Sequence, residues 1–326
     1  MKYDVKRFSK LVLRICITAV LLWFVLSRID LKQFREVAKE AKWFYLFIVL
    51  GLGVVSFWIR AVKMQIILRK QQCDVGIGTV FGANAVTALY SLILPGLLST
   101  TVKWYILKRN TGKGSNVFSS MVYNQVTEMA VRILVGLIAI LLTYPGNGLK
   151  IPVLCGILSA FIIVGSVLIL NRWAGEKIFI AAGYALRPFP EVIRAKTEKI
   201  LEQIRVFQTA GWAFHLLIFA ITLLGAALGA VIYIFAARAA SIDVSPVVLV
   251  WQSSVVFVLS RLPISIANLG VREITLIEFL ALYGVEAPAA LLMSMIIFSV
   301  NILIGLIGCG FQICWMVGAK TAEERN

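Results

Sequence analysis

Four charged residues inside strongly apolar stretches are the side chains best placed to do chemistry. Glu128 and Arg132 lie four residues apart, so on a helix they share one face, with the glutamate on the favourable N-terminal side. Arg272 and Glu273 are adjacent and follow an apolar stretch that contains Pro263. Charges at membrane depth are costly and commonly mark the pathway of a substrate or an ion. We therefore expect these four residues to bind a charged group.

Each pair also has a purely structural interpretation. Glu128 and Arg132 could simply neutralise each other. Glu273, in the first turn of a helix, could compensate the helix dipole. The functional alternative is that Glu128 engages Arg272 or Arg261 and that this contact breaks when a substrate arrives. Glu278 is a third acidic residue near membrane depth and could join the same network.

The first break in the apolar sequence is Pro95-Gly96, inside the stretch 77–101. Basic residues flank this stretch on both sides, which a single membrane crossing cannot achieve. The simplest interpretation is a re-entrant hairpin that enters as a helix over 79–93 and leaves after the break; two tight full crossings are the alternative. Lys103 would add a positive charge to the first turn of the second helix. Three good N-cap residues precede it: Ser99, Thr100 and Thr101.

The second break runs from Pro263 to Gly270, inside the apolar region 247–283. Irregular backbone at membrane depth must face protein or a wet cavity, because hydrocarbon offers it no hydrogen bonds. Asn268 or Gly270 would cap the helix that follows. The N-terminus of that helix, with Arg272 in its first turn, suits a phosphate group.

The two breaks indicate an internal repeat. Pro95 and Pro263 are separated by about half the chain, and by flanking charge the first hairpin enters from the cytoplasm and the second from outside. Broken segments paired in opposite orientation are typical of an inverted-repeat transporter with its site near the midplane. We predict a single domain over 1–326, with repeats over 1–165 and 170–320. Two unrelated proline kinks are the alternative.

Composition places these residues in a membrane protein. The chain is 60% hydrophobic and only 15% charged, against about 25% charged residues in soluble domains. Together with the two hairpins, the apolar runs predict an all-α polytopic protein with about six full transmembrane helices, or with eight spans. Six runs approach the roughly 20 residues that cross a bilayer: 11–27, 43–59, 129–144, 152–170, 212–237 and 289–317.

The basic residues that give the net charge of +16 gather beside these runs, which indicates membrane topology rather than nucleic-acid binding. We expect both termini on the cytoplasmic side of the cell membrane, with 11–27 as a retained first span. Segments 28–42 and 171–208 are typical of amphipathic surface helices. Four basic residues after the second run are expected in a cytoplasmic loop: Arg60, Lys63, Arg69 and Lys70.

Nothing in the sequence requires a catalytic centre. It contains no HExxH motif, no nucleophile elbow and no phosphate-binding loop. The five cysteines lack metal-ligand spacing, and the single histidine, His215, lies near the start of a span. We therefore expect no enzyme, no metal and no cofactor. A membrane-embedded transferase that uses Glu128 or Glu273 is the third-ranked alternative.

Several of these residues also occur in a pattern known from one family. The pattern consists of Leu94-Pro95-Gly96, Lys103, Glu128, Arg132, Leu262-Pro263-Ile264-Ser265, Leu269-Gly270-Val271-Arg272-Glu273 and Gly284-Val285. It resembles the lysylphosphatidylglycerol synthase transmembrane region, whose members are also called flippase-like domain proteins. The chain departs from that family at Ser99-Thr100, where a glycine and an acidic residue are usual, and at Ala267-Asn268, where glycines are common.

The resemblance implies translocation of an anionic phospholipid or a lipid-linked sugar between leaflets. Full synthases carry an aminoacyl-transfer domain after the membrane part; none follows here, so no aminoacylation is expected. The alternative is an accessory subunit of a cell-envelope glycolipid or glycosyltransferase pathway, docked through 171–208, and an oligomer is open. On this resemblance the headgroup-binding residues are Arg272, Glu273, Lys103, Glu128, Arg132 and Arg261, with hairpin breaks at Pro95, Gly96, Pro263, Gly270 and Asn268.

Overall fold

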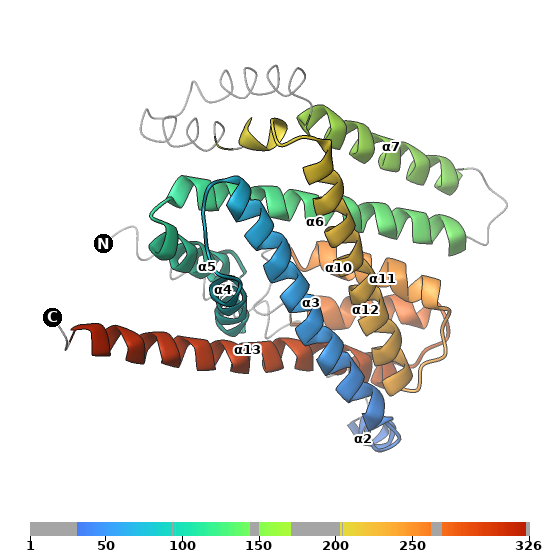
Figure 1. Ribbon diagram of the computed structural model, residues 1–326. Coiled ribbons are helices and arrows are strands. Elements are labelled where there is room, and N and C mark those ends of the chain that lie inside the picture. The colour runs from blue at the N-terminus through green and yellow to red at the C-terminus, as the bar shows by residue number, and fades with distance from the viewer. Residues whose placement is uncertain are drawn as a thin grey trace, which may run out of the picture. The chain divides into compact units, whose positions relative to one another are not determined.

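The structure, a computed structural model, describes residues 31–92, 94, 96–143, 150–170, 203, 205–261 and 269–323. Every regular element in these described residues is a helix (Figure 1), which confirms the all-α prediction for this part of the chain. In chain order the helices are α2 (Leu31–Lys39), α3 (Trp43–Lys70), α4 (Ile77–Ser91), α5 (Gly96–Thr111), α6 (Gly114–Thr143), α7 (Lys150–Leu170), α10 (Trp212–Ala239), α11 (Pro246–Leu259), α12 (Val271–Ala281) and α13 (Ala287–Glu323).

Within the described residues, four helices are long and apolar enough to cross a membrane. They are α3, α6, α10 and the part of α13 from Ala287 to Met316, and they overlap four of the six predicted runs. A fifth run forms α7, which is 21 residues long and apolar over Val153–Val164. The run 11–27 lies outside the described residues.

The two predicted breaks each separate a pair of short helices. α4 and α5 have 15 and 16 residues, and α11 and α12 have 14 and 11. Each is shorter than the roughly 20 residues that an upright crossing needs. Pro95, Pro263 and Asn268 lie outside the described residues.

The predicted N-cap of α5 is wrong. The helix already begins at Gly96, so Ser99, Thr100 and Thr101 lie inside its first turns. The hydroxyl of Thr101 donates to the Leu98 carbonyl at 2.6 Å, as a threonine in a helix interior does. A helix can begin directly after a break because its first four N–H groups have no acceptor within the helix in any case.

The surface helices are only partly described. The short helix predicted within 28–42 is α2, and its Val37 and Ala38 pack against a buried core. Of the segment 171–208, the structure describes Gln203 and residues 205–208, and the turn predicted at 144–148 also lies outside the described residues.

The chain divides into two compact units that are interleaved in the sequence. Unit 1 comprises Met1–Trp58, Phe81–Lys103 and Ala227–Asn326, and unit 2 comprises Ile59–Val80 and Trp104–Ala226. Each unit therefore contains residues from both halves of the chain. The division into sequential repeats stays a prediction.

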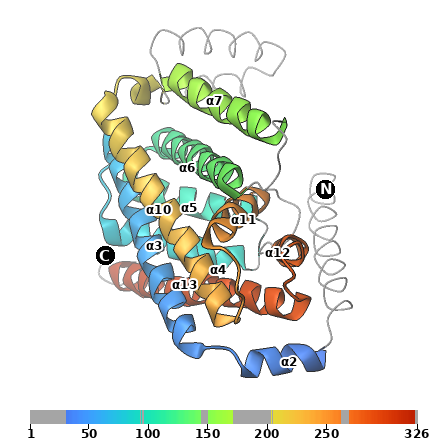
Figure 2. The same ribbon diagram turned by 90° about the vertical axis from the view of Figure 1, so that its right-hand side faces the viewer.

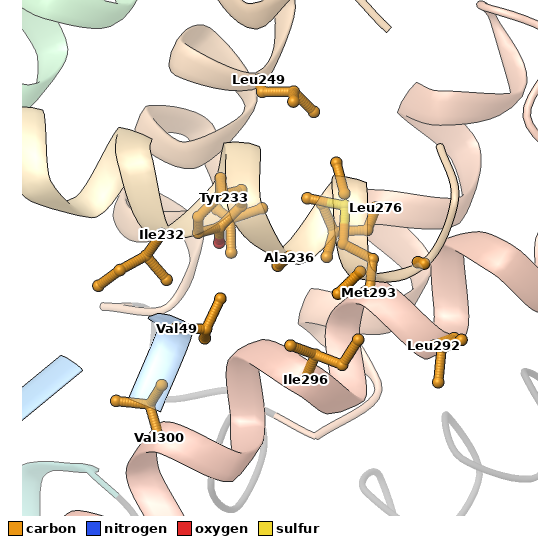
Figure 3. Packing of buried hydrophobic residues seen from close by; sticks show 14 of the residues in the cluster. Val49, Ile232, Tyr233, Ala236, Leu249, Leu276, Leu292, Met293, Ile296 and Val300 are labelled. Carbon is orange, nitrogen blue, oxygen red and sulfur yellow. The ribbon is translucent and has the colours of Figure 1, made fainter. Parts of the chain in front are cut away.

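The core of unit 1 lies where α3, α10, α11, α12 and α13 contribute apolar side chains (Figure 3). Val49, Tyr233, Leu249, Leu276 and Met293 are all buried there. Both α2 and α12 also pack against α13 (Figures 1 and 2). The membrane-length helix α13 thus contacts both α2 and α12, and α11 packs against α12.

A glycine brings α4 and α13 into direct backbone contact. A side chain at Gly308 would overlap the carbonyl group of Ala85, so only a hydrogen fits there. Four residues along α13, the Gln312 amide donates to the Tyr90 hydroxyl at 2.9 Å. Small residues allow such close approach between membrane helices, where packing replaces the hydrophobic effect as the driving force.

Unit 2 is built around α6, which lies beside α7 (Figure 1). At one end of α6, the Asn116 amide donates to the side chains of Gln71 and Gln203, at 3.3 and 2.9 Å. The ring of Tyr123 stacks on Phe207 with centroids 4.1 Å apart. These contacts join α3, α6 and the segment before α10.

We predict that Gly308→Ala destabilises the protein, because the added methyl group overlaps the Ala85 backbone. Overpacking of this kind costs about 1–3 kcal/mol. The measurement is thermal unfolding of the purified protein in detergent, where the midpoint should fall. Gly310→Ala is the matched control, since no described atom lies within 4 Å of its added carbon. Its midpoint should stay or rise, and equal losses in both variants would contradict the predicted contact.

Candidate functional site

A cluster of buried charges joins three long helices of unit 2. Lys63 of α3 lies with its Nζ 3.2 Å from Oε1 of Glu128 on α6. The same ammonium donates to the hydroxyl of Thr222 on α10 at 3.3 Å. We name this set the Lys63 cluster: Arg60, Lys63, Glu128, Arg132 and Thr222. Lys63, Glu128 and Arg132 are each less than one tenth exposed.

Helix geometry explains why these residues meet. Arg60 and Lys63 are three residues apart on α3, and Glu128 and Arg132 are four apart on α6, so each pair shares a face. Glu128 lies fourteen residues after Gly114 and fifteen before Thr143, which places it at the middle of α6. Glu128 and Arg132 are therefore both far from the ends of the membrane-length helix α6.

Two further hydrogen bonds orient the cluster. The hydroxyl of Thr222 donates to the carbonyl of Ile218 at 2.6 Å, so its lone pairs face Lys63 as acceptors. The guanidinium of Arg132 donates to the carbonyl of Gly225 at 3.4 Å. Gly225 begins the small-residue segment Gly225-Ala226-Ala227-Leu228-Gly229 of α10.

The cluster lines a small pocket. Three lining residues are basic and one is acidic among the described residues around it, so the lining carries a formal charge of +2. Its space suits about one water molecule. Away from bulk water, charges act on a ligand more strongly than they would in solution. The lining residues are Ile59, Arg60, Lys63, Glu128, Arg132, Ile221, Thr222 and Gly225.

The sequence analysis assigned Lys63 to a cytoplasmic loop, and this was wrong. The helix α3 continues to Lys70, eleven residues past the predicted end of the run at 59, and Lys63 is 2% exposed within it. The sequence does contain a signal that the helix continues, namely apolar residues at helical spacing beyond Arg60. These apolar residues are all fully buried: Ala61, Met64, Ile67 and Leu68.

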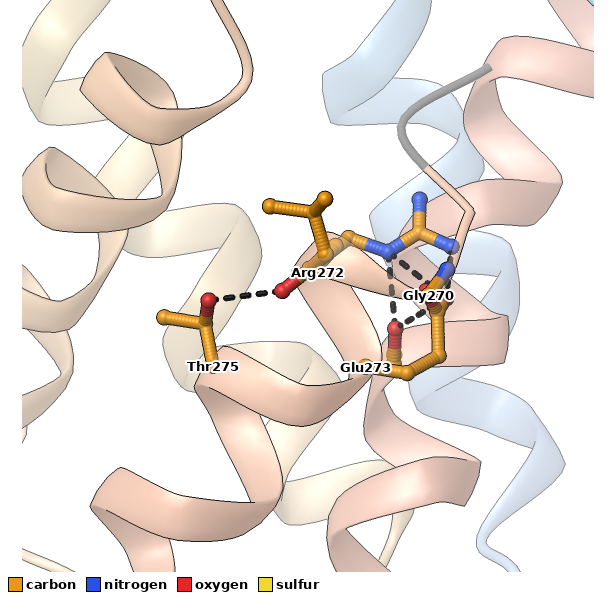
Figure 4. A network of polar contacts seen from close by, with 6 residues as sticks. Gly270, Arg272, Glu273 and Thr275 are labelled. Atoms are coloured by element: carbon orange, nitrogen blue, oxygen red, sulfur yellow. Dashed lines mark hydrogen bonds and ion pairs between the residues drawn. The ribbon is translucent and has the colours of Figure 1, made fainter. Parts of the chain in front are cut away.

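A second cluster of charges lies at the start of α12 in unit 1 (Figure 4). Arg272 forms an ion pair with Oε1 of Glu273, and its Nε donates to the Ser294 hydroxyl at 2.7 Å. The Ser294 hydroxyl in turn donates to the same carboxylate oxygen at 2.9 Å. The Arg272 guanidinium also lies over the ring of Phe298, 4.9 Å from its centroid.

The same glutamate fixes the helix start. The N-cap of α12 is Gly270, one of the two predicted cap residues, and its φ of 84° lies in the region that favours glycine. Its backbone N–H donates to Oε2 of Glu273 at 2.7 Å. Arg272 and Glu273 are buried and neutralise each other, so this geometry supports a structural role. Their predicted role in headgroup binding stays a prediction.

The remaining predicted site residues differ in burial and in their contacts. Lys103 is partly buried on α5, and Arg261 is exposed with its guanidinium 4.5 Å from the centroid of the Phe257 ring. Glu278 is exposed on α12. Glu128 belongs to unit 2, where it holds Lys63, whereas Arg272 holds Glu273 in unit 1.

Comparison with known families assigns the chain. The family model for the lysylphosphatidylglycerol synthase TM region matches residues 11–308, which include both charge clusters and both pairs of short helices. The chain belongs to this family. Comparison with curated proteins and with solved structures gave no match.

Family membership and the four long apolar helices together make the chain a multi-pass membrane protein. The resemblance predicted from the sequence is thereby confirmed. The matched region contains Glu128, Arg132, Arg272 and Glu273, and it also contains Lys63, which was not among the predicted site residues.

We predict that Arg272→Met strongly destabilises the fold, because it leaves the Glu273 carboxylate buried without its ion-pair partner. Such a loss costs about 3–5 kcal/mol. Combining it with Glu273→Gln should cost less than the sum of the two single changes, because the charge left behind is removed. Denaturant unfolding in detergent measures both, with the exposed Glu278→Gln as the control that should change little. Strictly additive losses would refute the coupling.

Proposed function

We propose that this protein is a lipid translocase, in which the Lys63 cluster carries an anionic lipid headgroup across the hydrocarbon layer. The observation that supports this is the excess of positive charge around the pocket beside the middle of α6. Three basic side chains and one carboxylate line the pocket between α3, α6 and α10. Such intramembrane charges usually mark a transport pathway.

The physical need for this arrangement comes from the cost of moving a phosphate through hydrocarbon. An ion loses its hydration there, and the free-energy cost of that loss is large unless protein charges compensate it. Lys and Arg donate strong, charge-assisted hydrogen bonds to phosphate oxygens. A lining with a formal charge of +2 therefore lowers the barrier for an anionic headgroup and leaves a cationic one excluded.

The short helices supply the rest of the proposal. We assign α4 with α5, and α11 with α12, as re-entrant hairpins of an inverted repeat, with both chain termini cytoplasmic. Their lengths support this, since none reaches the length of a full crossing. Half-helices of this kind expose backbone groups to a cavity rather than to lipid.

In this proposal the two charge clusters have different roles. The Lys63 cluster contacts the headgroup, and Arg272 with Glu273 holds the start of α12 in place. The partners are membrane lipids, namely an anionic phospholipid or a lipid-linked sugar phosphate. Translocation changes the position of the lipid and breaks no covalent bond, so the proposal assigns no enzymatic step.

The test is translocation of a headgroup-labelled phosphatidylglycerol in reconstituted vesicles, read by quenching from the outer leaflet. We expect Lys63→Gln to slow translocation by about tenfold or more, the effect of losing one hydrogen bond to a charged group. Arg69→Gln is the matched control on the same helix, because its side chain is 63% exposed. It should leave the rate unchanged.

The variants need equal protein per vesicle. If Lys63→Gln alone does not fold, the double variant Lys63→Gln with Glu128→Gln removes the whole ion pair and leaves no uncompensated carboxylate. Wild-type rates no faster than those of empty vesicles would refute the proposed function. Equal rates in wild type and a folded Lys63 variant would show that translocation does not depend on the Lys63 cluster.

A further inference from the structure

We infer that Glu128 is a built-in competitor for the lipid phosphate: it holds Lys63 when the site is empty, and an entering phosphate group takes its place. This inference rests on the proposed function, since it says how the same site binds and releases its anion. The ligand class is a phosphate mono- or diester attached to a lipid.

Space limits the access of a ligand to Lys63. The pocket beside the Lys63–Glu128 pair has room for about one water molecule. A phosphate group is larger, so it cannot reach Lys63 while the carboxylate remains at 3.2 Å from the ammonium. The carboxylate already occupies the position that an anion would take. Binding therefore requires an exchange of one anion for another.

The two acceptors of Lys63 differ in charge and in how firmly they are held. Thr222 is neutral, and its hydroxyl is anchored by the carbonyl of Ile218 on its own helix. Glu128 is charged, and its place can be taken by any anion with oxygen acceptors. The exchange leaves the Thr222 contact intact and returns one charge-assisted hydrogen bond to Lys63.

A displaced Glu128 carboxylate has a basic residue nearby on its own helix. Arg132 is four residues along the same helix, within side-chain reach of Glu128. The side chain of Glu128 can therefore turn toward Arg132 without leaving the cluster, and its charge stays compensated. When it turns back to Lys63, it expels the phosphate. One carboxylate thus pairs with Lys63 at rest and also releases the ligand.

The other buried pair shows why this role belongs to Glu128. The carboxylate of Glu273 also accepts from the backbone N–H of Gly270, so an anion that displaced it would uncap α12. Glu128 lies in the middle of α6, where the backbone N–H groups are already used by the helix. Its displacement costs no helix cap.

The exchange of Glu128 for phosphate at Lys63 predicts a result that differs from the one expected for a purely structural ion pair. Glu128→Gln removes the competitor, so the affinity for the anion should rise by about tenfold, within the range typical of coupled binding. The same change should slow translocation, because nothing then displaces the bound phosphate. A structural pair would lose affinity and rate together when it is broken.

The binding experiment uses the full chain in detergent and measures the Kd by titration calorimetry. The probes are dihexanoyl phosphatidic acid, inorganic phosphate and the zwitterionic dihexanoyl phosphatidylcholine. The proteins are wild type, Glu128→Gln, Lys63→Gln and the double variant. Asp74→Asn is the control, since it removes a carboxylate from an exposed ion pair with Arg69 in the same unit.

We expect phosphatidic acid to bind most tightly, Glu128→Gln to tighten it and Lys63→Gln to weaken it. The effect of Glu128→Gln should vanish in the Lys63→Gln background, since the two anions compete for that ammonium. An equal effect in both backgrounds would reduce the role of Glu128 to its long-range charge and overturn the inference. Inorganic phosphate that binds as tightly as the lipid would overturn the lipid assignment.

Failure of the inference and failure of the proposed function give different results. If wild type translocates lipid but a folded Glu128→Gln binds the probe no more tightly, the inference fails and the function stands. If the binding series follows the expected order but wild-type vesicles do not translocate lipid, the exchange stands and the proposed function fails.

Discussion

The absence of water from hydrocarbon is the constraint on which the rest of this structure depends. A charge on a membrane-length helix must find its partner on another helix of the protein, because lipid tails offer none. Lys63 meets this need through Glu128 and Thr222, from two different helices. One buried ammonium thereby fixes the relative register of α3, α6 and α10 within unit 2.

The two charge clusters satisfy the same constraint in different ways. At the start of α12, Arg272, Glu273 and Ser294 form a closed set in which each polar group contacts the others, and the helix cap belongs to it. The Lys63 cluster has more positive than negative side chains around its pocket. A closed neutral set stabilises a fold, whereas an excess of one charge at a small pocket favours a ligand of the opposite charge.

Packing in unit 1 follows from the same environment. Because hydrophobic burial gives little advantage between helices in lipid, close contact depends on small residues, and Gly308 provides it against Ala85. The short helix α12 then packs against the long α13, and α11 packs against α12, in the core of Figure 3. The helices that flank the second break are thus held by contacts with other helices of the protein.

Much of the fold is local and could be predicted from the sequence. Apolar runs of membrane length gave the positions of α3, α6, α10 and α13, because a bilayer selects for length and composition alone. The breaks before α5 and α12 and the cap at Gly270 follow from residues within a few positions. The shared face of Glu128 and Arg132 follows from a helical spacing. Tertiary structure alone decided the partner of Glu128: Lys63 lies 65 residues away on another helix, and no local pattern encodes a contact across that distance. It also decided that Arg272, Glu273 and Ser294 form a closed set, because Ser294 reaches them only once α12 packs on α13.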